Sequence, residues 1–174
     1  KIGGAIYVAP KGTTLPVDAK AALDVAFKGL GYVSEDGLGN DNSMSSEEVK
    51  AWGGDTVLTM SNDKTDKFTF ALMEIMDVAV LKVVFGDDNV SGTLDTGITV
   101  RSNNTPQEDK AWVFDLILNG NVLKRIVIQN ASVAEVAEVT YKDDEAVLYE
   151  VTINAKAGDS SFDYDTHKEY IVKA

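Results

Sequence analysis

The side chains that could carry out chemistry are few and do not form a catalytic set. The chain has a single histidine, His167, and no cysteine, so a multi-histidine metal site and a thiol nucleophile are both excluded. The serines show no nucleophile-elbow pattern, and the glycines of Trp52-Gly53-Gly54-Asp55 are not followed by the lysine and hydroxyl residue of a phosphate-binding loop. His167 lies among acidic residues, and we interpret it as a solvated side chain without a functional role.

Two acidic turns offer oxygen ligands to a hard cation such as calcium. Asp87-Asp88-Asn89 and residues 159–165 each bring several oxygens together, but neither has the spacing of an EF-hand loop. We interpret both as acidic turns and predict no metal, no cofactor and no catalytic residue. The many carboxylates leave an acidic-site hydrolase as an alternative, which would need clustered carboxylates in a cleft.

The two tryptophans raise a second alternative, a carbohydrate-binding β-sandwich with a sugar-stacking surface. Trp112 lies on an alternating apolar face and is predicted to be in the core. For Trp52, beside two glycines, the sequence leaves both a buried and an exposed position open. A secreted sugar-binding module would also need export, and the segment KIGGAIYVAP is too short and too lightly charged for a signal peptide. We therefore expect a protein made and kept in the cytosol, or released by lysis.

The charge balance argues against nucleic-acid and membrane binding. The 28 acidic residues outnumber the 16 basic residues, giving a net charge of −12 that opposes non-specific binding to DNA or anionic lipid. No apolar run approaches the length of a membrane span. The 174 residues, 44% of them hydrophobic, suit one core, and we predict a single domain over residues 1–174.

Short strands separated by turn residues dominate the chain and predict a mainly β fold. We expect an antiparallel β-sandwich or partly closed barrel with one or two flanking helices and a long protruding β-hairpin. One helix would begin after Asp18 and stop at Gly29, and a second would cover residues 74–85 and end at Gly86. The predicted strands are 2–9 (an edge strand), 66–72, 96–101, 111–119, 123–129, 133–141, 147–156 and 170–172, the last within a C-terminal strand segment, 166–174.

Alternation predicts which side chains fill the core. The inward positions are Phe68, Phe70 and Leu72; Trp112, Phe114, Leu116 and Leu118; Val147, Tyr149, Val151 and Ile153; and, on the second helix, Ile75, Val78, Leu81 and Phe85.

The protruding hairpin is predicted over residues 31–60, as two strand-like ends joined by a polar middle without core-forming residues. Residues 39–48 are predicted to be a mobile loop at the hairpin tip. The acids of this arm are set against Lys50 alone, so the arm presents a negative surface; they are Glu35, Asp36, Asp41, Glu47, Glu48 and Asp55.

Five segments in this order resemble a known family: AFKGLGYVSEDGLGN, VKAWGGDTVLT, VVFGDDNV, VLKRIVI and YKDDEAVLYEVTI. Together they resemble the major tail protein, or tail tube protein, of long-tailed bacteriophages that infect Gram-positive hosts. The resemblance implies hexameric rings that stack into a tube, with a long hairpin adding strands to an inner barrel through which DNA passes. The tubes of contractile tails and bacterial secretion systems share the fold and stay an alternative.

The resemblance also implies roles for the arm. Strand alternation would turn some of these acids toward the lumen, where DNA would slide past them without specific binding; the candidates are Glu35, Asp36, Glu47, Glu48 and Asp55. Ring stacking would order the polar loop, whose residues are Asn40, Asp41, Asn42, Ser43, Met44, Ser45 and Ser46. Expected partners are further copies of the chain, a tape measure protein and a tail terminator or distal tail protein. The location would be the virion tail, after assembly in the host cytoplasm.

Overall fold

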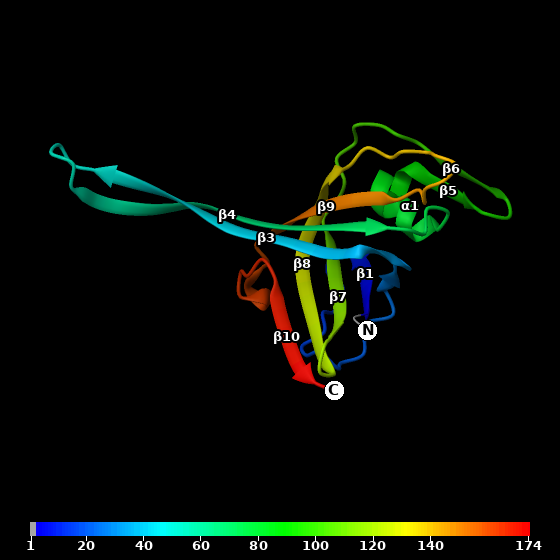
Figure 1. The fold of residues 1–174 in the computed structure, drawn as a ribbon, viewed down its shortest axis with the longest axis horizontal. Coiled ribbons are helices and arrows are strands. Elements are labelled where there is room, and N and C mark those ends of the chain that lie inside the picture. The colour runs from blue at the N-terminus through cyan, green and yellow to red at the C-terminus, as the bar shows by residue number, and fades with distance from the viewer. Residues whose placement is uncertain (1–2) are drawn as a thin grey trace.

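One antiparallel sheet organises the molecule (Figure 1). The computed structural model describes residues 3–174, without the side chains of residues 57 and 59–62, so the predicted strand start at Ile2 lies outside it. The strands pair in the order β2-β1-β7-β8-β9-β4-β3, and β10 also pairs with β8. Their bounds are β1 Gly3–Pro10, β2 Lys28–Gly29, β3 Val33–Lys50, β4 Thr56–Leu72, β7 Lys110–Leu118, β8 Val122–Val136, β9 Tyr149–Lys156 and β10 Lys168–Lys173.

Outside this sheet, β5 (Val90–Thr93) and β6 (Gly97–Val100) form a small hairpin, and α1 (Val78–Phe85) is the α-helix of the described chain. Two short 3-10 turns, η1 (Asp87–Asn89) and η2 (Ser160–Phe162), complete the elements. The predicted mainly β, antiparallel fold is confirmed, and the sheet does not close into a barrel.

The long strand β8 joins the two halves of the sheet. One edge of β8 pairs with β7, and the other edge pairs with β10 along Val122–Val127 and then with β9 along Asn130–Val136. The turn from β7 into β8 has the sequence Asn119-Gly120-Asn121, in which Gly120 and Asn121 have φ values of 80° and 60°. Two successive positive φ values suit the twist of a two-residue hairpin.

The core lies between the sheet and α1, and its largest side chains are aromatic. Phe68, Phe70, Trp112 and Phe114 are buried and pack in contact, with ring centroids 5.4 Å apart for Phe68 and Phe114. The indole N–H of Trp112 donates to the carbonyl of Ala131 (3.2 Å), which satisfies the polar atom of a buried ring. The predicted inward faces of β4, β7 and β9 are therefore confirmed at these aromatic positions and at Tyr149, Val151 and Ile153.

The second predicted helix is confirmed, but it begins later than expected. The Asp77 carboxylate accepts the backbone N–H of Ala79 (2.7 Å) and caps α1, while residues 74–77 form a turn before it. The predicted stop at Gly86 is confirmed by its φ of 99°. Of the four residues predicted to bury the helix, Leu81 is buried, whereas Ile75, Val78 and Phe85 are partly buried.

The first predicted helix is wrong, although its cap forms. The Asp18 carboxylate accepts the backbone N–H groups of Lys20 and Ala21, as at a helix start. The carbonyls of Asp18 and Ala21 then accept from Nη1 of Arg125 (3.1 and 2.7 Å) instead of from the next helical turn. Arg125 is fixed in this position because its guanidinium binds both carboxylate oxygens of Asp115.

Three strand predictions also need correction. The predicted strand 133–141 is the end of β8, which stops at Val136, and residues 137–148 form a loop. The strand β5, which follows the acidic turn 87–89, is absent from the predicted strands. The predicted edge strand β1 lies between β7 and β2, but β2 pairs with it at two positions, Tyr7 and Val8.

Candidate functional site: the hairpin arm

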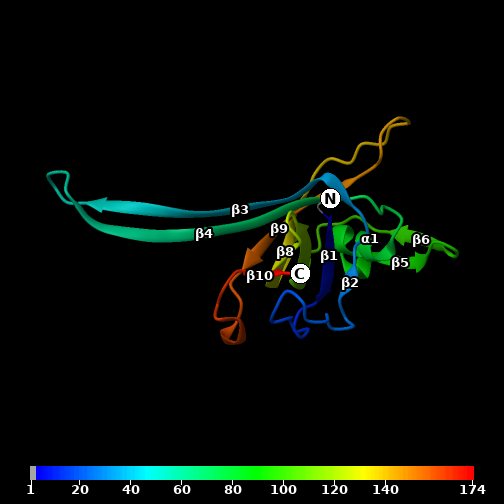
Figure 2. The ribbon, with the colours of Figure 1, turned by 60° about the horizontal axis from the view of Figure 1, so that its bottom comes forward.

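The hairpin of β3 and β4 projects far beyond the body of the protein, as Figures 1 and 2 show. Residues Lys67–Leu72 of β4 pair with β9 on one side and β3 on the other, and this part belongs to the body. From Asp66 outward to Thr56, β4 pairs with β3 alone among the described strands. We call this two-stranded part, residues 42–66 with the tip turn, the free arm. The whole hairpin, from Val33 to Leu72, is longer than the predicted hairpin 31–60, because the predicted strand 66–72 forms its base.

The predicted tip loop is wrong, because residues 39–48 lie within β3. Their pairing runs from Gly39 opposite Thr69 to Glu48 opposite Thr59, so the seven residues assigned to a stacking loop are in a strand. The turn lies further out, where the N–H of Ala51 donates to the carbonyl of Asp55 (2.8 Å) and the N–H of Gly54 to that of Ala51 (3.0 Å). Cross-strand pairing overrides the weak strand propensity of Ser, Asn and Gly here.

The five predicted lumen acids are all exposed but do not share one face. Glu35 and Asp36 lie where the β3–β4 register breaks between Val33 and Leu38, and Asp55 lies in the tip turn. Glu47 and Glu48 are adjacent in β3, so strand alternation places them on opposite faces. The hairpin also contains Lys64 and Lys67 in addition to Lys50, so it is less one-sidedly acidic than predicted.

One face of the sheet is polar from the body onto the arm. In β4 and β9 the residues between the core positions point away from the core, and the hydroxyls of Thr69 and Thr152 hydrogen-bond across the strands (3.0 Å). In β3, Asp41 lies opposite Lys67, and Glu47 has the same strand parity as Asp41. We call this surface the polar face; its residues are Asp41, Ser43, Glu47, Thr65, Lys67, Thr69, Glu150, Thr152 and Asn154.

A buried carboxylate fixes the point where the arm leaves the body. Asp66 is fully buried and accepts hydrogen bonds from the Asn40 amide (2.9 Å), the Thr166 hydroxyl (2.6 Å) and Nδ1 of His167. Burial alone would raise the pKa of Asp66, but the hydrogen bonds from Thr166, His167 and Asn40 outweigh it and hold this pKa below its usual value. The carboxylate therefore ties both arm strands to the segment that precedes β10.

His167 is not the solvated side chain predicted. Its side chain is 9% exposed, and its ring packs edge-on against Phe68 with centroids 5.3 Å apart. Asp66 is not among the predicted functional residues, although its position in the sequence carries a signal. Asp66 has the same strand parity as Phe68, Phe70 and Leu72, so alternation places a charged residue at an inward position.

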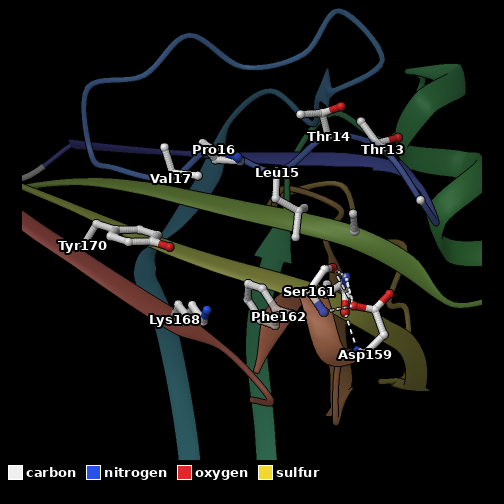
Figure 3. A pocket seen from close by; sticks show the side chains of 13 residues that line it. Thr13, Thr14, Leu15, Pro16, Val17, Asp159, Ser161, Phe162, Lys168 and Tyr170 are labelled. Atoms are coloured by element: carbon white, nitrogen blue, oxygen red, sulfur yellow. Dashed lines mark hydrogen bonds between the residues drawn. The ribbon is translucent and has the colours of Figure 1, made fainter. Parts of the chain in front are cut away.

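The pocket in Figure 3 shows polar groups that are already paired with one another. Its volume is about 370 Å³, and it lies between the segment 12–17 and the segment 159–170. Asp159 accepts from Ser161 and Gln129, and these hydrogen bonds lower the pKa of its carboxyl. The ammonium of Lys168 lies 4.7 Å from the centroid of the Phe162 ring and binds Asp163. This arrangement stabilises the loop and brings no nucleophile and base together.

The side chains of the two segments interpreted as acidic turns pair with neighbouring residues of the protein. Asp87 binds Lys110, and Asn89 donates to the carbonyl of Phe85. Within residues 3–174, no group of three or more His, Cys, Asp or Glu side chains is placed to hold a metal ion. In the same range, no helix has the length and apolar character needed to cross a membrane.

The two tryptophans have opposite environments. Trp112 is in the core as predicted, and Trp52 is fully exposed in the tip turn of the arm. A single exposed ring at the end of a ribbon does not make a sugar-binding platform.

Known proteins provide two kinds of comparison. By structure, the chain is similar to the PVC sheath–tube complex of an extracellular contractile injection system in its extended state (TM-score 0.49, 9% identity, covering 98% of this chain and 88% of that chain). It is also similar to the tube-terminating cap of the anti-feeding prophage (TM-score 0.45, 11% identity, 97% and 88% covered). At TM-scores below 0.5 these likenesses carry no argument about assembly.

The sequence comparison is more decisive. No curated protein matches the chain. The family model described as "Phage tail tube protein" matches residues 3–167, which is nearly the whole sequence. The matched range includes the hairpin arm, the core strands and Asp66, at the point where the arm leaves the body. The chain therefore belongs to the phage tail tube protein family and is a structural component of a phage tail.

Proposed function

We propose that copies of this protein form hexameric rings that stack into the tail tube of a long-tailed phage of a Gram-positive host, and that DNA passes through the tube during ejection. The observation that carries the proposal is the free arm, a long two-stranded ribbon that continues the polar face and whose strand edges have no partner among the described strands. Membership of the family indicates a tube, and the free arm has surfaces through which one copy could contact another.

The unpaired edge favours association with further copies. β3 has 18 residues and is the last strand of the sheet, so its outer edge has no partner among the described strands. A long open edge is a template for pairing with another chain, and a two-stranded ribbon without a core is marginally stable in water. Pairing of neighbouring arms would satisfy the backbone groups of this edge and give the arm a third strand.

The polar face suits the wall of a DNA channel. It carries hydroxyl and amide groups together with Asp41, Glu47 and Glu150, whereas Lys67 is its one cation among the residues assigned to it. Such a surface stays wet and repels phosphates, so DNA would slide along it without binding. Of the five acids first assigned to the lumen, Glu47 lies on this face; Glu35, Asp36, Glu48 and Asp55 would line the arm's other surfaces.

The remaining parts of the proposal concern the assembly as a whole. The strand residues 40–46 would take part in contacts between rings as part of the arm. A tape measure protein would occupy the lumen before DNA, and a terminator and a distal tail protein would bind the tube ends. The rings would assemble in the host cytoplasm from single-domain subunits and remain in the virion tail.

Negative-stain electron microscopy of the concentrated protein tests the proposal directly. We expect rings with six subunits and tubes built of such rings. A protein that stays monomeric at high concentration, or that forms rings of another symmetry, contradicts it.

A further inference from the structure

The tip of the arm carries a side chain that its own chain does not use. Trp52 is completely exposed, while the turn around it is held by the Ala51–Asp55 and Gly54–Ala51 backbone hydrogen bonds. Gly53 and Gly54 have φ values of 125° and 97°, which fit glycine and shape the turn. The ribbon therefore ends in a defined turn that presents an indole ring, with the carboxylate of Asp55 close by in sequence.

A pocket at the other end of the molecule offers a complementary surface. Its volume is about 360 Å³, and it lies between the end of β1, the segment before β2 and the exposed side of α1. Apolar side chains form much of its lining, among them Val8, Pro10, Val78 and Val83. An apolar pocket of this size is suited to an aromatic anchor.

The rim of this pocket is basic in a protein that is strongly acidic overall. Lys28, Lys82 and Lys110 line it together with one acid, Asp87, which binds Lys110. Within the described chain, Lys28 and Lys82 have no carboxylate partner. Lys82 also suits the last turn of α1, where a cation interacts well with the helix dipole, but that does not account for Lys28. We call this site the lysine-rimmed pocket.

We propose that Trp52 and Asp55 of one copy dock into the lysine-rimmed pocket of a second copy. Trp52 would enter the apolar part, where a lysine ammonium can lie over the indole face, and Asp55 would meet the unpaired Lys28 or Lys82. The pocket of Figure 3 fits less well, because its Lys168 is already bound to Asp163 and its Asp159 is acidic like the tip. Charge complementarity therefore selects the lysine-rimmed pocket as the receptor.

Because of where the tip and the pocket lie, the proposed contact would repeat from one copy to the next. The arm tip and α1 lie at opposite ends of the molecule in both views, so one chain cannot close the contact on itself (Figures 1 and 2). A head-to-tail contact between different surfaces generates rings or open filaments instead of closed dimers. The inference rests on the proposed tube and deepens it by naming an anchor and a receptor.

Cysteine crosslinking tests the contact, because the chain has no native cysteine. The double variant Ala51→Cys/Ala26→Cys keeps Trp52, Asp55 and the three lysines, places the second thiol in the lining of the lysine-rimmed pocket, and should give a ladder of covalent oligomers on oxidation. The matched control, Ala51→Cys/Val17→Cys, places the second thiol at the exposed edge of the Figure 3 pocket and should give no ladder. A ladder in the control alone, or in neither protein, overturns the inference.

Charge exchange and truncation give a second readout. Asp55→Lys should weaken assembly, and adding Lys28→Asp should restore it. Trp52→Ala should raise the critical concentration for assembly by about thirtyfold, as expected for a buried tryptophan anchor, whereas Trp52→Phe should have a smaller effect. Lys28, Trp52 and Asp55 are all exposed, so the melting temperature of the monomer should not change.

The two proposals fail in different ways. If the wild-type protein forms tubes and Trp52→Ala forms them equally well, the docking inference is wrong and the tube proposal stands. If the wild-type protein forms neither rings nor tubes, the tube proposal is wrong, and the crosslinking pair in concentrated solution still decides whether tip and pocket meet.

Discussion

Replacing Asp66 by Asn tests whether the buried carboxylate stabilises the point where the arm leaves the body. The substitution removes a charge while keeping the size of the side chain. The carboxylate accepts three hydrogen bonds from Asn40, Thr166 and His167 in a fully buried position. An asparagine keeps one acceptor oxygen and turns an NH₂ group toward donors. A hydrogen bond to a charged group contributes about 1.5 to 3 kcal/mol, so we expect the free energy of unfolding to fall by about that amount at pH 7.

The lowered pKa of Asp66 determines how the stability difference between the wild-type protein and Asp66→Asn changes with pH. The pKa of Asp66 is lower in the folded protein than the ordinary value of 3.8. A lowered pKa means that the contribution of Asp66 to stability is complete above the unfolded pKa and is lost as the pH falls through the folded pKa. The difference in stability between the wild-type protein and Asp66→Asn should therefore be largest near neutral pH and shrink on acidification below about pH 4.

Urea denaturation at a series of pH values measures both effects. Asp63→Asn is the matched control, because Asp63 lies on the same strand three residues further out and is exposed. An Asp66→Asn protein as stable as the Asp63→Asn control at pH 7 would refute the role of the buried carboxylate. A loss that stays constant from pH 7 to pH 3 would show that the defect comes from packing and not from the charge.

Four further predictions follow from the core, the small hairpin, the polar face and the arm. Phe114→Ala removes a fully buried ring and should cost about 3 to 5 kcal/mol in a thermal or urea melt. Gly92→Ala should cost about 1 to 3 kcal/mol, because Gly92 has a φ of 90° and a Cβ there would run into the backbone of the partner strand; Gly3→Ala, in open space, is the control. Asp41→Lys with Glu150→Lys should leave tubes intact and slow DNA ejection from phage that carry both changes; unchanged ejection contradicts an acidic lining. Replacing residues 44–64 by Asn-Gly should change the monomer's unfolding free energy by less than about 1 kcal/mol and abolish tubes in electron micrographs.

The sequence predicts the body of the protein well, because there the chain buries its own side chains. Phe68 and Phe70 alternate with polar residues in β4, Trp112 and Phe114 share one face of β7, and all four are buried. Alternation is informative wherever one face of a strand meets the core. The helix α1 could be predicted for a related reason, since its stop at Gly86 is a local signal that needs no tertiary contact.

Two misses have causes that lie far away in the sequence. The segment after Asp18 has a cap and helical spacing, but Arg125, from a distant strand, takes its carbonyls. In the sequence His167 stands among acids that are solvated, but its partner in the fold is Asp66, about a hundred residues earlier. Neither pairing leaves a local pattern in the sequence, and both depend on which strands become neighbours.

The error at the arm has a different cause, which concerns function. Residues 39–48 have no apolar alternation, because most of them lie in the free arm, and neither face of the free arm meets a core within its own chain. A stretch without apolar alternation is predicted to be a loop. The strand nevertheless forms over 18 residues, although a ribbon of this kind gains little stability in isolation. Its length, its open edge and its exposed Trp52 are explained by contacts with other copies more readily than by the fold of one subunit. The free arm, whose structure could not be predicted from the sequence, is therefore the part of the chain where contacts between copies should be sought.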